Sequence, residues 1–367
     1  MAIPLLPFYL TTVLGAGALT LGWIEGMADA VASLLKLVSG RWSDRIDRRR
    51  PFILAGYGLS SLIRPFLGAT SSAGHVLLVR LIDRTGKGLR NSPRDALIAR
   101  SVDEGERAAA FGLNRALDHA GAVLGPLVAA GFLFWVSQDV RVLFWLTAIP
   151  GAMALALLIW GVREVDDRPA APPTPLPPET KQAPQLWRFL LPLGLFTLGN
   201  ASDVFLLLKA GGEQASITTL PLLWMGLHIV KSLSSIPGGR LADRIGRRRT
   251  IAAGWVFYAA VYAGFAFADT PREIAALFVV YGLYHGLTEG AERALVADLA
   301  PARGQGTAFG WYHLTLGLLS LAASLLFGGL WDAFGSHVAF LTSAGLALIA
   351  ALSMAALAST SAKAQPG

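Results

Sequence analysis

Long apolar runs alternate with short polar connections along most of this chain. About 20 apolar residues in a row are enough for a helix to cross the hydrocarbon core of a bilayer. In lipid, a segment must satisfy its own backbone hydrogen bonds, which favours helices. We therefore predict an all-α polytopic membrane protein with helices at roughly 1–16, 18–39, 51–70, 74–97, 106–136, 140–162, 188–209, 216–238, 250–268, 273–299, 305–330 and 337–358.

One segment breaks this pattern. Residues 164–187 contain the run PAAPPTPLPP, which cannot form helix or core and predicts an extended linker. The linker separates an N-terminal half, residues 1–163, from a C-terminal half, residues 188–367, with six apolar runs in each. We predict two pseudo-symmetric six-helix bundles.

The two halves are internal repeats. GRWSDRIDRRR at 40–50 matches GRLADRIGRRR at 239–249, an offset of 199 positions. DALIA and AAFG, at 95–99 and 109–112, match RALVA and TAFG at 293–297 and 307–310, an offset of 198. Parallel repeats of this kind place a substrate site between the halves near the bilayer midplane.

Composition and charge agree with a membrane protein. The chain is 54% hydrophobic and 15% charged, whereas soluble domains carry about 25% charged residues. The net charge of +7 comes from arginines in short connections, so we expect a lipid bilayer and no nucleic acid as partner, with the 40–50 and 239–249 loops cytoplasmic in a prokaryotic inner membrane. The chain has no cysteine, and we expect no metal site and no cofactor.

The two Arg-rich loops resemble the loop signature of the major facilitator superfamily, Gly-x-x-x-Asp-Arg-x-Gly-Arg-Arg. The resemblance covers essentially the whole chain, and IEG…ASLLKLVSGRWSDR with DRTGKG and PRDALIA is similar to an uncharacterised prokaryotic branch. It implies the major facilitator fold and gating loops formed by Gly40, Asp44, Arg45, Arg48, Gly239, Asp243, Arg244 and Arg247.

The resemblance also implies partners for the two loop carboxylates. Asp44 is expected at the helix N-terminus near 304–307, and Asp243 at the one near 107–109, each in the other half. The alternative is that both loops serve only as solvated topology signals. Asp47 stands where the second copy has Gly246, and Asp tolerates a positive φ better than most residues.

Ionisable residues inside the predicted helices are costly and usually face a cavity or a partner. Many of them share one helical face at about 100° per residue. We predict a substrate or ion cavity lined by Glu25, Asp29, Arg80, Arg84, Lys87, Arg115, Asp118, Asp203, His228, Lys231, His285, Glu289 and His313.

Two interpretations of the cationic stripe at residues 80–94 remain open. It binds an anion, because arginine suits carboxylate or phosphate, or it is neutralised by Glu25 and Asp29. Residues 94, 95, 292 and 293 carry swapped signs between the repeats, which favours gate ion pairs. For Arg64, before Pro65, we expect snorkelling or packing. The candidates for proton coupling are Asp203, Glu289, Glu25, His285 and His313.

The function predicted from these features is secondary active transport of a small polar or anionic solute by alternating access, coupled to protons, by a monomer. The alternatives are a drug or metabolite efflux antiporter, which GAVLGP at 121–126 resembles in part, and a non-transporting membrane protein on the same fold. The nucleotide-binding pattern GxxxxGK[ST] is absent, as are HExxH and GxSxG, so we expect no ATP hydrolysis and no enzyme.

The repeat also predicts that the chain begins inside its first helix. An offset of 199 places Met1 opposite Asn200, about twelve residues into the helix at 188–209. The remaining 16 residues reach about 24 Å, short of a core of about 30 Å. This favours a start codon assigned too late over a genuine truncation that inserts poorly; the other alternative is a short first helix in a thinned bilayer.

Overall fold

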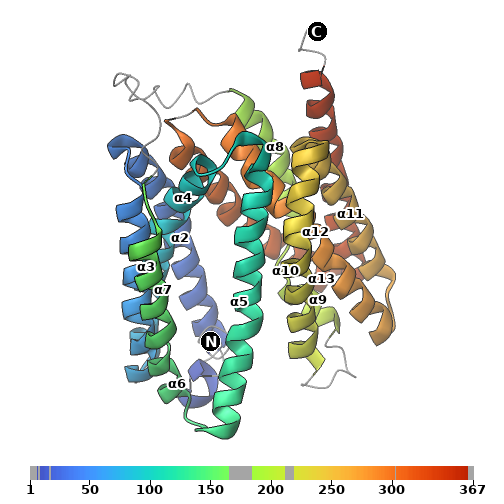
Figure 1. Cartoon of the computed structure of the whole chain (residues 1–367). Coiled ribbons are helices and arrows are strands. Elements are labelled where there is room, and N and C mark those ends of the chain that lie inside the picture. Colours follow the sequence, from blue (N-terminus) through green and yellow to red (C-terminus); the bar gives the residue numbers. More distant parts are fainter. Residues whose placement is uncertain are drawn as a thin grey trace. The chain divides into compact units, whose positions relative to one another are not determined.

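The structure is a computed structural model that describes residue 6 and residues 9–15, 18–164, 184–210, 219–301 and 303–362. The described residues are helical or in short connections, with no strand among them. Figure 1 shows the helices in chain order. Their bounds are η2 Tyr9–Val13, α2 Ala18–Ile46, α3 Arg50–Ile63, η3 Arg64–Ala69, α4 Ala73–Arg100, η4 Glu104–Glu106, α5 Arg107–Trp135, α6 Val140–Leu146, α7 Ala148–Gly161, α8 Pro184–Gly199, α9 Val204–Ala210, α10 Thr219–Ile245, α11 Arg247–Phe267, α12 Pro271–Leu299 and α13 Gln305–Ala362.

The predicted all-α fold is confirmed, because every predicted run after the first coincides with described helix. The first run, 1–16, is described only at residue 6 and at 9–15, so most of the predicted truncated helix lies outside the described residues. Most of the predicted linker, at 165–183, also lies outside them.

The ends of α2 and α10 differ from the prediction. Both were expected to stop before the Arg-rich loops, at 39 and 238, but they continue to Ile46 and Ile245. Most of each loop motif is therefore the last two turns of a helix. Each helix ends just before a residue with positive φ, Asp47 at 49° and Gly246 at 99°, a conformation that cannot continue a right-handed helix.

Two breaks divide the helical stretches of the C-terminal half. The run at 188–209 breaks at Asn200–Asp203 between α8 and α9, where Ser202 Oγ accepts a hydrogen bond from the Val204 amide. Short polar side chains compete with the helical backbone in this way and cap the next helix. Within α13, Gly335 has a φ of 83° and separates two helical stretches, as the predicted runs 305–330 and 337–358 required.

The chain forms two compact units. Unit 1 comprises Met1–Ser101, Leu124–Thr180 and Pro301–Leu314; unit 2 comprises Val102–Val123, Lys181–Ala300 and Thr315–Gly367. Each unit therefore includes a helix start from the opposite sequence half. The start of α13 belongs to unit 1, and the start of α5 belongs to unit 2. The division at the linker remains a prediction from the repeat.

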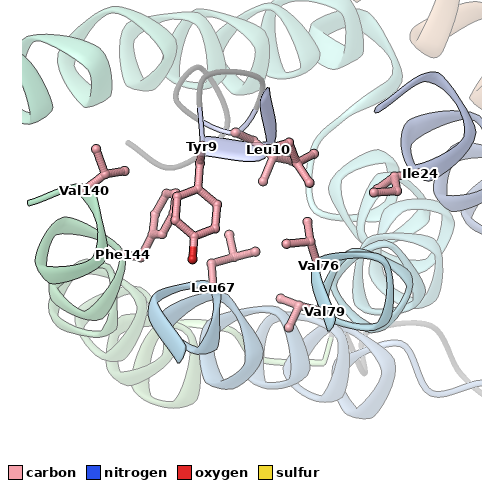
Figure 2. Close-up of a cluster of buried hydrophobic side chains, with 9 residues drawn as sticks. Tyr9, Leu10, Ile24, Leu67, Val76, Val79, Val140 and Phe144 are labelled. Atoms are coloured by element: carbon pink, nitrogen blue, oxygen red, sulfur yellow. The ribbon is translucent and has the colours of Figure 1, made fainter. Parts of the chain in front are cut away.

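In unit 1, α4 packs against both α2 and α3, while η3 packs against α6. Figure 2 shows a cluster of buried side chains in which Tyr9 meets Phe144 edge to face, with ring centroids 5.1 Å apart. The Tyr9 hydroxyl donates to the carbonyl of Thr70 at 2.7 Å, so the buried phenol is satisfied.

In unit 2, α12 packs against α10 and α11. Its core is aromatic: Phe196 of α8 stacks on Trp255 of α11 with centroids 4.6 Å apart, and Tyr258 stacks on Tyr262 at 4.1 Å. The Tyr258 hydroxyl donates to the carbonyl of Gly199, the last residue of α8. This bond holds the α8–α9 break next to the aromatic core.

Six described helical stretches are long and apolar enough to cross a membrane. Their outer faces carry large exposed apolar side chains, including Phe134 and Trp135 at 80% and Trp160 at 79% exposure. Contiguous exposed apolar surface on this scale is suited to lipid. Most buried charged groups lie on α2, α4, α10 and α12, outside these six stretches.

Candidate functional site

The first loop carboxylate lies at the N-terminus of α13. Asp44, near the end of α2, accepts hydrogen bonds from the amides of Gly306 at 3.0 Å and Thr307 at 2.6 Å. The Thr307 hydroxyl donates a third bond at 2.7 Å. These amides have no partner within their own helix, and a helix N-terminus favours an anion. We call this contact the first latch.

The second loop carboxylate makes the equivalent contact in unit 2. Asp243, near the end of α10, accepts hydrogen bonds from the amides of Ala108 at 3.1 Å and Ala109 at 2.8 Å, in the first turn of α5. We call this contact the second latch. Both carboxylates therefore lie at the helix starts that the family resemblance implied.

Glycine lets the helices approach at each latch. A methyl group at Gly40 would overlap the carbonyl oxygen of Gly306, and one at Gly239 would overlap that of Ala108. Each latch thus combines a buried anion with backbone-to-backbone contact one turn earlier along the same helix. The other predicted gating residues lie nearby: Arg45, Arg48 and Arg244 are exposed, whereas Arg247 is half-buried.

Each latch is reinforced by ion pairs that the sequence did not single out. At the second latch, Arg247 pairs with both Asp243 and Asp298, and Arg107 pairs with Asp298 at 2.8 Å. At the first latch, the buried Arg49 lies 3.6 Å from Asp44. Asp298 occupies the position in the second repeat that Arg100 occupies in the first. The repeat therefore does not predict the ion pairs of Asp298, which are found only in the folded structure.

The turn after α2 holds a second ion-pair group. Arg49 and Arg100 both contact Asp47, at 3.1 and 3.3 Å. Burial raises the pKa of Asp47, but the hydrogen bonds and charges of these two arginines outweigh it and hold the pKa below its usual range. Glu164 accepts hydrogen bonds from the amides of Arg49 and Arg50 and so caps the start of α3.

The cationic stripe on α4 is largely neutralised by acidic side chains of α2. Arg80 makes two hydrogen bonds to Glu25, at 2.9 and 2.5 Å. Arg84 contacts Glu25 and Asp29, both at 3.2 Å. The structure therefore favours the neutralised interpretation for these two arginines, because buried charge is tolerated when it is paired.

Two further cationic side chains lie on or beside the α4 stripe. Arg64 pairs with the buried Asp83 at 2.8 Å, an ion pair that the expectation of snorkelling or packing did not specify. Lys87, one turn beyond Arg84, is partly exposed. Among the described residues, no carboxylate lies within 4.0 Å of its ammonium group.

A buried histidine joins α4 to the start of α13 in unit 1. His313 Nε2 lies 2.9 Å from Asp95 Oδ2, and Arg94 contacts the other carboxylate oxygen at 3.1 Å. Asp95 is fully buried. The predicted gate carboxylate at 95 thus contacts His313 from the opposite sequence half, together with its neighbour Arg94.

In unit 2, the α8–α9 break brings Asp203 into a second polar site. Lys231 of α10 pairs with Asp203 Oδ2 at 3.0 Å, and the Tyr281 hydroxyl of α12 donates to Oδ1 at 2.8 Å. Asp203 lies in the turn between α8 and α9, where the helix is not continuous. The interruption, which the apolar pattern hid, therefore positions one of the predicted coupling residues.

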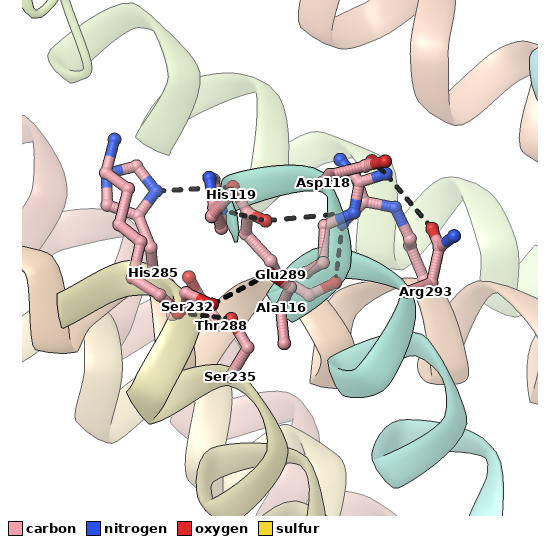
Figure 3. Close-up of polar contacts among 12 residues, drawn as sticks. Ala116, Asp118, His119, Ser232, Ser235, His285, Thr288, Glu289 and Arg293 are labelled. Carbon is pink, nitrogen blue, oxygen red and sulfur yellow. Dashed lines mark hydrogen bonds and ion pairs between the residues drawn. The ribbon is translucent and has the colours of Figure 1, made fainter. Parts of the chain in front are cut away.

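Histidines from three helices meet next to this pair, and Figure 3 labels two of them, His119 and His285, together with Glu289. His119 Nδ1 of α5 lies 3.2 Å from His228 Nδ1 of α10. Glu289 of α12 lies 3.4 Å from His119 Nε2 and 3.3 Å from His285 Nδ1. Arg115 lies 4.0 Å from Glu289 and pairs with Asp118 one turn further along α5.

This arrangement can hold and exchange protons, because histidine and carboxylate groups lie within hydrogen-bonding reach of one another. His119 was not among the predicted cavity residues, although it follows Asp118 on the same face of α5. The sequence does not show that His119 contacts His228, because the two residues are 109 positions apart in the chain. No group of three or more metal-ligating side chains with suitable geometry occurs among the described residues.

Comparisons with known proteins agree on one family and one fold. The family model described as Major Facilitator Superfamily matches residues 1–226 and 210–366. The chain is 31% identical to the uncharacterized MFS-type transporter MJ1317 of Methanocaldococcus jannaschii, over 96% of this chain and 89% of that protein. It is 23% identical to the multidrug resistance protein MdtG of Klebsiella pneumoniae, over 96% of this chain and 88% of that protein. The crystal structure of the human organic anion transporter MFSD10 (TETRAN) is similar in fold, with a TM-score of 0.77 and 17% identity over 94% of this chain and 88% of that one.

Proposed function

The chain belongs to the Major Facilitator Superfamily, and from this premise we propose that it is a secondary active transporter of a small polar or anionic solute, working by alternating access and coupled to protons. Membership of a transporter family makes it a multi-pass membrane protein that takes part in transport. Beyond this, we propose the solute class and the coupling ion.

The paired latches carry the alternating-access part of the proposal. Each sequence half sends one carboxylate, Asp44 or Asp243, to a helix start of the other half. Contacts made of hydrogen bonds to a helix terminus can break and re-form without covalent change. Both latches lie at the Arg-rich ends of their helices, which we assign to the cytoplasmic side on the basis of charge.

The polar site in unit 2 supports proton coupling. Asp203, in the α8–α9 break, and Glu289, in α12, are carboxylates that both lie beside basic groups. A carboxylate that is ionised beside a cation takes up a proton when that cation moves away, because burial alone favours the neutral form. Alternating access moves helices past one another, so the same motion that opens a latch can change these pairings.

Lys87 supports an anionic or polar solute. Glu25 and Asp29 already contact Arg80 and Arg84, so these two arginines are poor candidates for binding an anion. Lys87, on the same helical face of α4, is the cation of the stripe that a solute carboxylate or phosphate would match best.

The second candidate is an efflux antiporter. GAVLGP in α5 resembles part of a motif of antiporter branches, and a methyl group at Gly121 would meet nothing within 4 Å. Close packing therefore does not account for this glycine. The 23% identity to a multidrug resistance protein points the same way.

Reconstitution tests the proposal directly. The purified chain would be placed in liposomes loaded with a pH-sensitive dye, and small carboxylates, phosphates, neutral polar solutes and cationic drugs would be added in turn. We expect solute-dependent proton movement for an anionic or polar solute. Response to cationic drugs alone would support the efflux candidate, and absence of any solute flux, with lipid movement instead, would support a non-transporting protein.

A further inference from the structure

In unit 2, α5 and α10 pack along a regular series of contacts that begins at the second latch. On α10 each contact lies about one turn from the previous one; on α5 the same spacing holds after the first two contacts, which share Ala108. The series, which we call the seam, comprises Asp243 with Ala108 and Ala109, Gly239 with Ala108, Ser235 with Gly112, Ser232 with Ala116, and His228 with His119.

The middle of the seam is made of small groups that do not respond to pH. A methyl group at Gly112 would overlap the carbonyl oxygen of Ser235. The Ser232 hydroxyl donates to the carbonyl of Ala116 at 2.8 Å. Only the two ends carry titratable side chains: Asp243 at the latch, and the pair of His119 and His228 at the far end.

The histidine pair can hold only a limited number of protons. A hydrogen bond between His119 Nδ1 and His228 Nδ1, 3.2 Å apart, needs an N–H on one ring and a lone pair on the other. Either ring can be the donor, so the contact survives when both rings are neutral or when one is charged. When both rings are charged, both nitrogens carry hydrogen, and like charges also repel at this distance.

Glu289 determines where the first proton is best held. Its carboxylate lies 3.4 Å from His119 Nε2, so a charged His119 can donate to Glu289 on one side and to His228 on the other. The other charged or titratable groups that face the pair are Arg115 and Asp118 on α5, Lys231 on α10, His285 on α12 and Asp203 in the α8–α9 break.

We propose that the His119–His228 pair is a proton-binding site that controls the seam: one bound proton is compatible with the closed seam, and the second separates α5 from α10 at this end. This inference deepens the proposed proton coupling and rests on it. Proton binding would thereby weaken the contact between two helices that also carry the second latch.

The test measures the seam itself and needs no solute. Because the chain has no cysteine, spin labels can be attached at Leu117→Cys on α5 and Leu233→Cys on α10, whose side chains are 64% and 72% exposed. Distances between the labels would be recorded by double electron–electron resonance for the full chain in lipid nanodiscs at about pH 8 and about pH 4. The lower value lies well below the ordinary histidine pKa, because the charge of the first proton opposes binding of the second.

We expect one short distance at high pH and an additional longer distance at low pH. In His228→Asn the amide can still donate to His119 but cannot become charged, so the short distance should persist at both pH values. In His228→Lys the ammonium supplies one fixed charge, so a single proton on His119 should be enough to separate the helices, and the longer distance should appear at a higher pH than in the parent. His75→Asn, at an exposed histidine in unit 1, is the matched control and should behave like the parent.

Two results would overturn the proposal. One is a distance distribution in the parent that does not change with pH; the other is a pH-dependent longer distance that remains in His228→Asn. Failure of proton coupling itself would be seen separately, as solute flux in liposomes that does not depend on a proton gradient.

Discussion

Asp44 and Thr307 are 263 positions apart in the chain, yet the carboxylate of Asp44 accepts hydrogen bonds from both the amide and the hydroxyl of Thr307, at 2.6 and 2.7 Å. Asp243 makes two amide bonds at the equivalent place and has no hydroxyl partner there, because Ala109 stands where the other copy has Thr307. The two latches therefore share a geometry but differ in the third hydrogen-bond donor, which is the Thr307 hydroxyl at Asp44 and the Arg247 guanidinium at Asp243.

The first prediction concerns the latches. Asp44→Asn and Asp243→Asn should each keep membrane insertion but reduce solute flux, because a hydrogen bond to a charged acceptor contributes about 2 kcal/mol. The two variants should have effects of similar size, since Asp44 accepts two amide bonds and one from the Thr307 hydroxyl, and Asp243 accepts two amide bonds and one from Arg247. Flux is measured in liposomes, with Thr307→Val and Thr307→Ser as a matched pair that removes or keeps the hydroxyl. Unchanged flux in the double Asp→Asn variant would exclude a gating role.

The second prediction concerns close helix approach. Replacing glycine by alanine within a helix usually stabilises it by about 1 kcal/mol. Gly26→Ala, where a methyl group would meet nothing within 4 Å, should follow this rule. Gly40→Ala should instead lower thermal stability, because its methyl group would overlap the carbonyl oxygen of Gly306. Equal melting temperatures for the two variants would show that α2 and the start of α13 are not held this closely.

The third prediction concerns the α4 stripe. Single cysteines at Lys87 and Asn91 should react with a water-soluble thiol reagent, whereas cysteines at Arg80 and Arg84 should be protected. Arg80 and Arg84 are at most 9% exposed and are paired with Glu25; Lys87 and Asn91 are partly exposed. Reaction at all four positions would mean that a water-filled path reaches the ion pairs as well.

The fourth prediction separates coupling from binding. If Asp203 or Glu289 carries the coupling proton, Asp203→Asn or Glu289→Gln should abolish accumulation driven by a pH gradient and spare solute exchange. Exchange requires only that the loaded carrier reorient, whereas accumulation requires proton release. Loss of both activities in one variant would assign that carboxylate to solute binding or folding.

The fifth prediction exchanges residues between the two loop copies. Gly246 has a φ of 99° and a ψ of 133°, outside the left-handed helical region that Asp can reach, whereas Asp47 has a φ of 49°. Gly246→Asp should therefore destabilise the protein by about 2 kcal/mol through backbone strain. Asp47→Gly introduces no strain and loses only the contacts with Arg49 and Arg100. Thermal unfolding in detergent compares the two; equal losses would contradict the strain argument.

Much of the fold was predictable because its signals are local and periodic. The apolar runs indicated the helices, and the duplicated motifs indicated the internal repeat. Family resemblance then placed Asp44 and Asp243 at helix starts. The same local signals missed the ends of α2 and α10, because the loop motif is polar yet helical, and missed the break at Asn200–Asp203, because its flanks are apolar.

The sequence by itself determined that this is a helical membrane protein of two repeated halves with a charged, conformationally special turn in each. Only the tertiary structure decided which charges neutralise one another: Arg80 with Glu25, Lys231 with Asp203, and His119 beside His228. The reason is physical. Hydropathy acts on each segment separately, whereas the interaction of two charges in a low-dielectric interior depends on their separation in space, which helices distant in the chain set only when they pack.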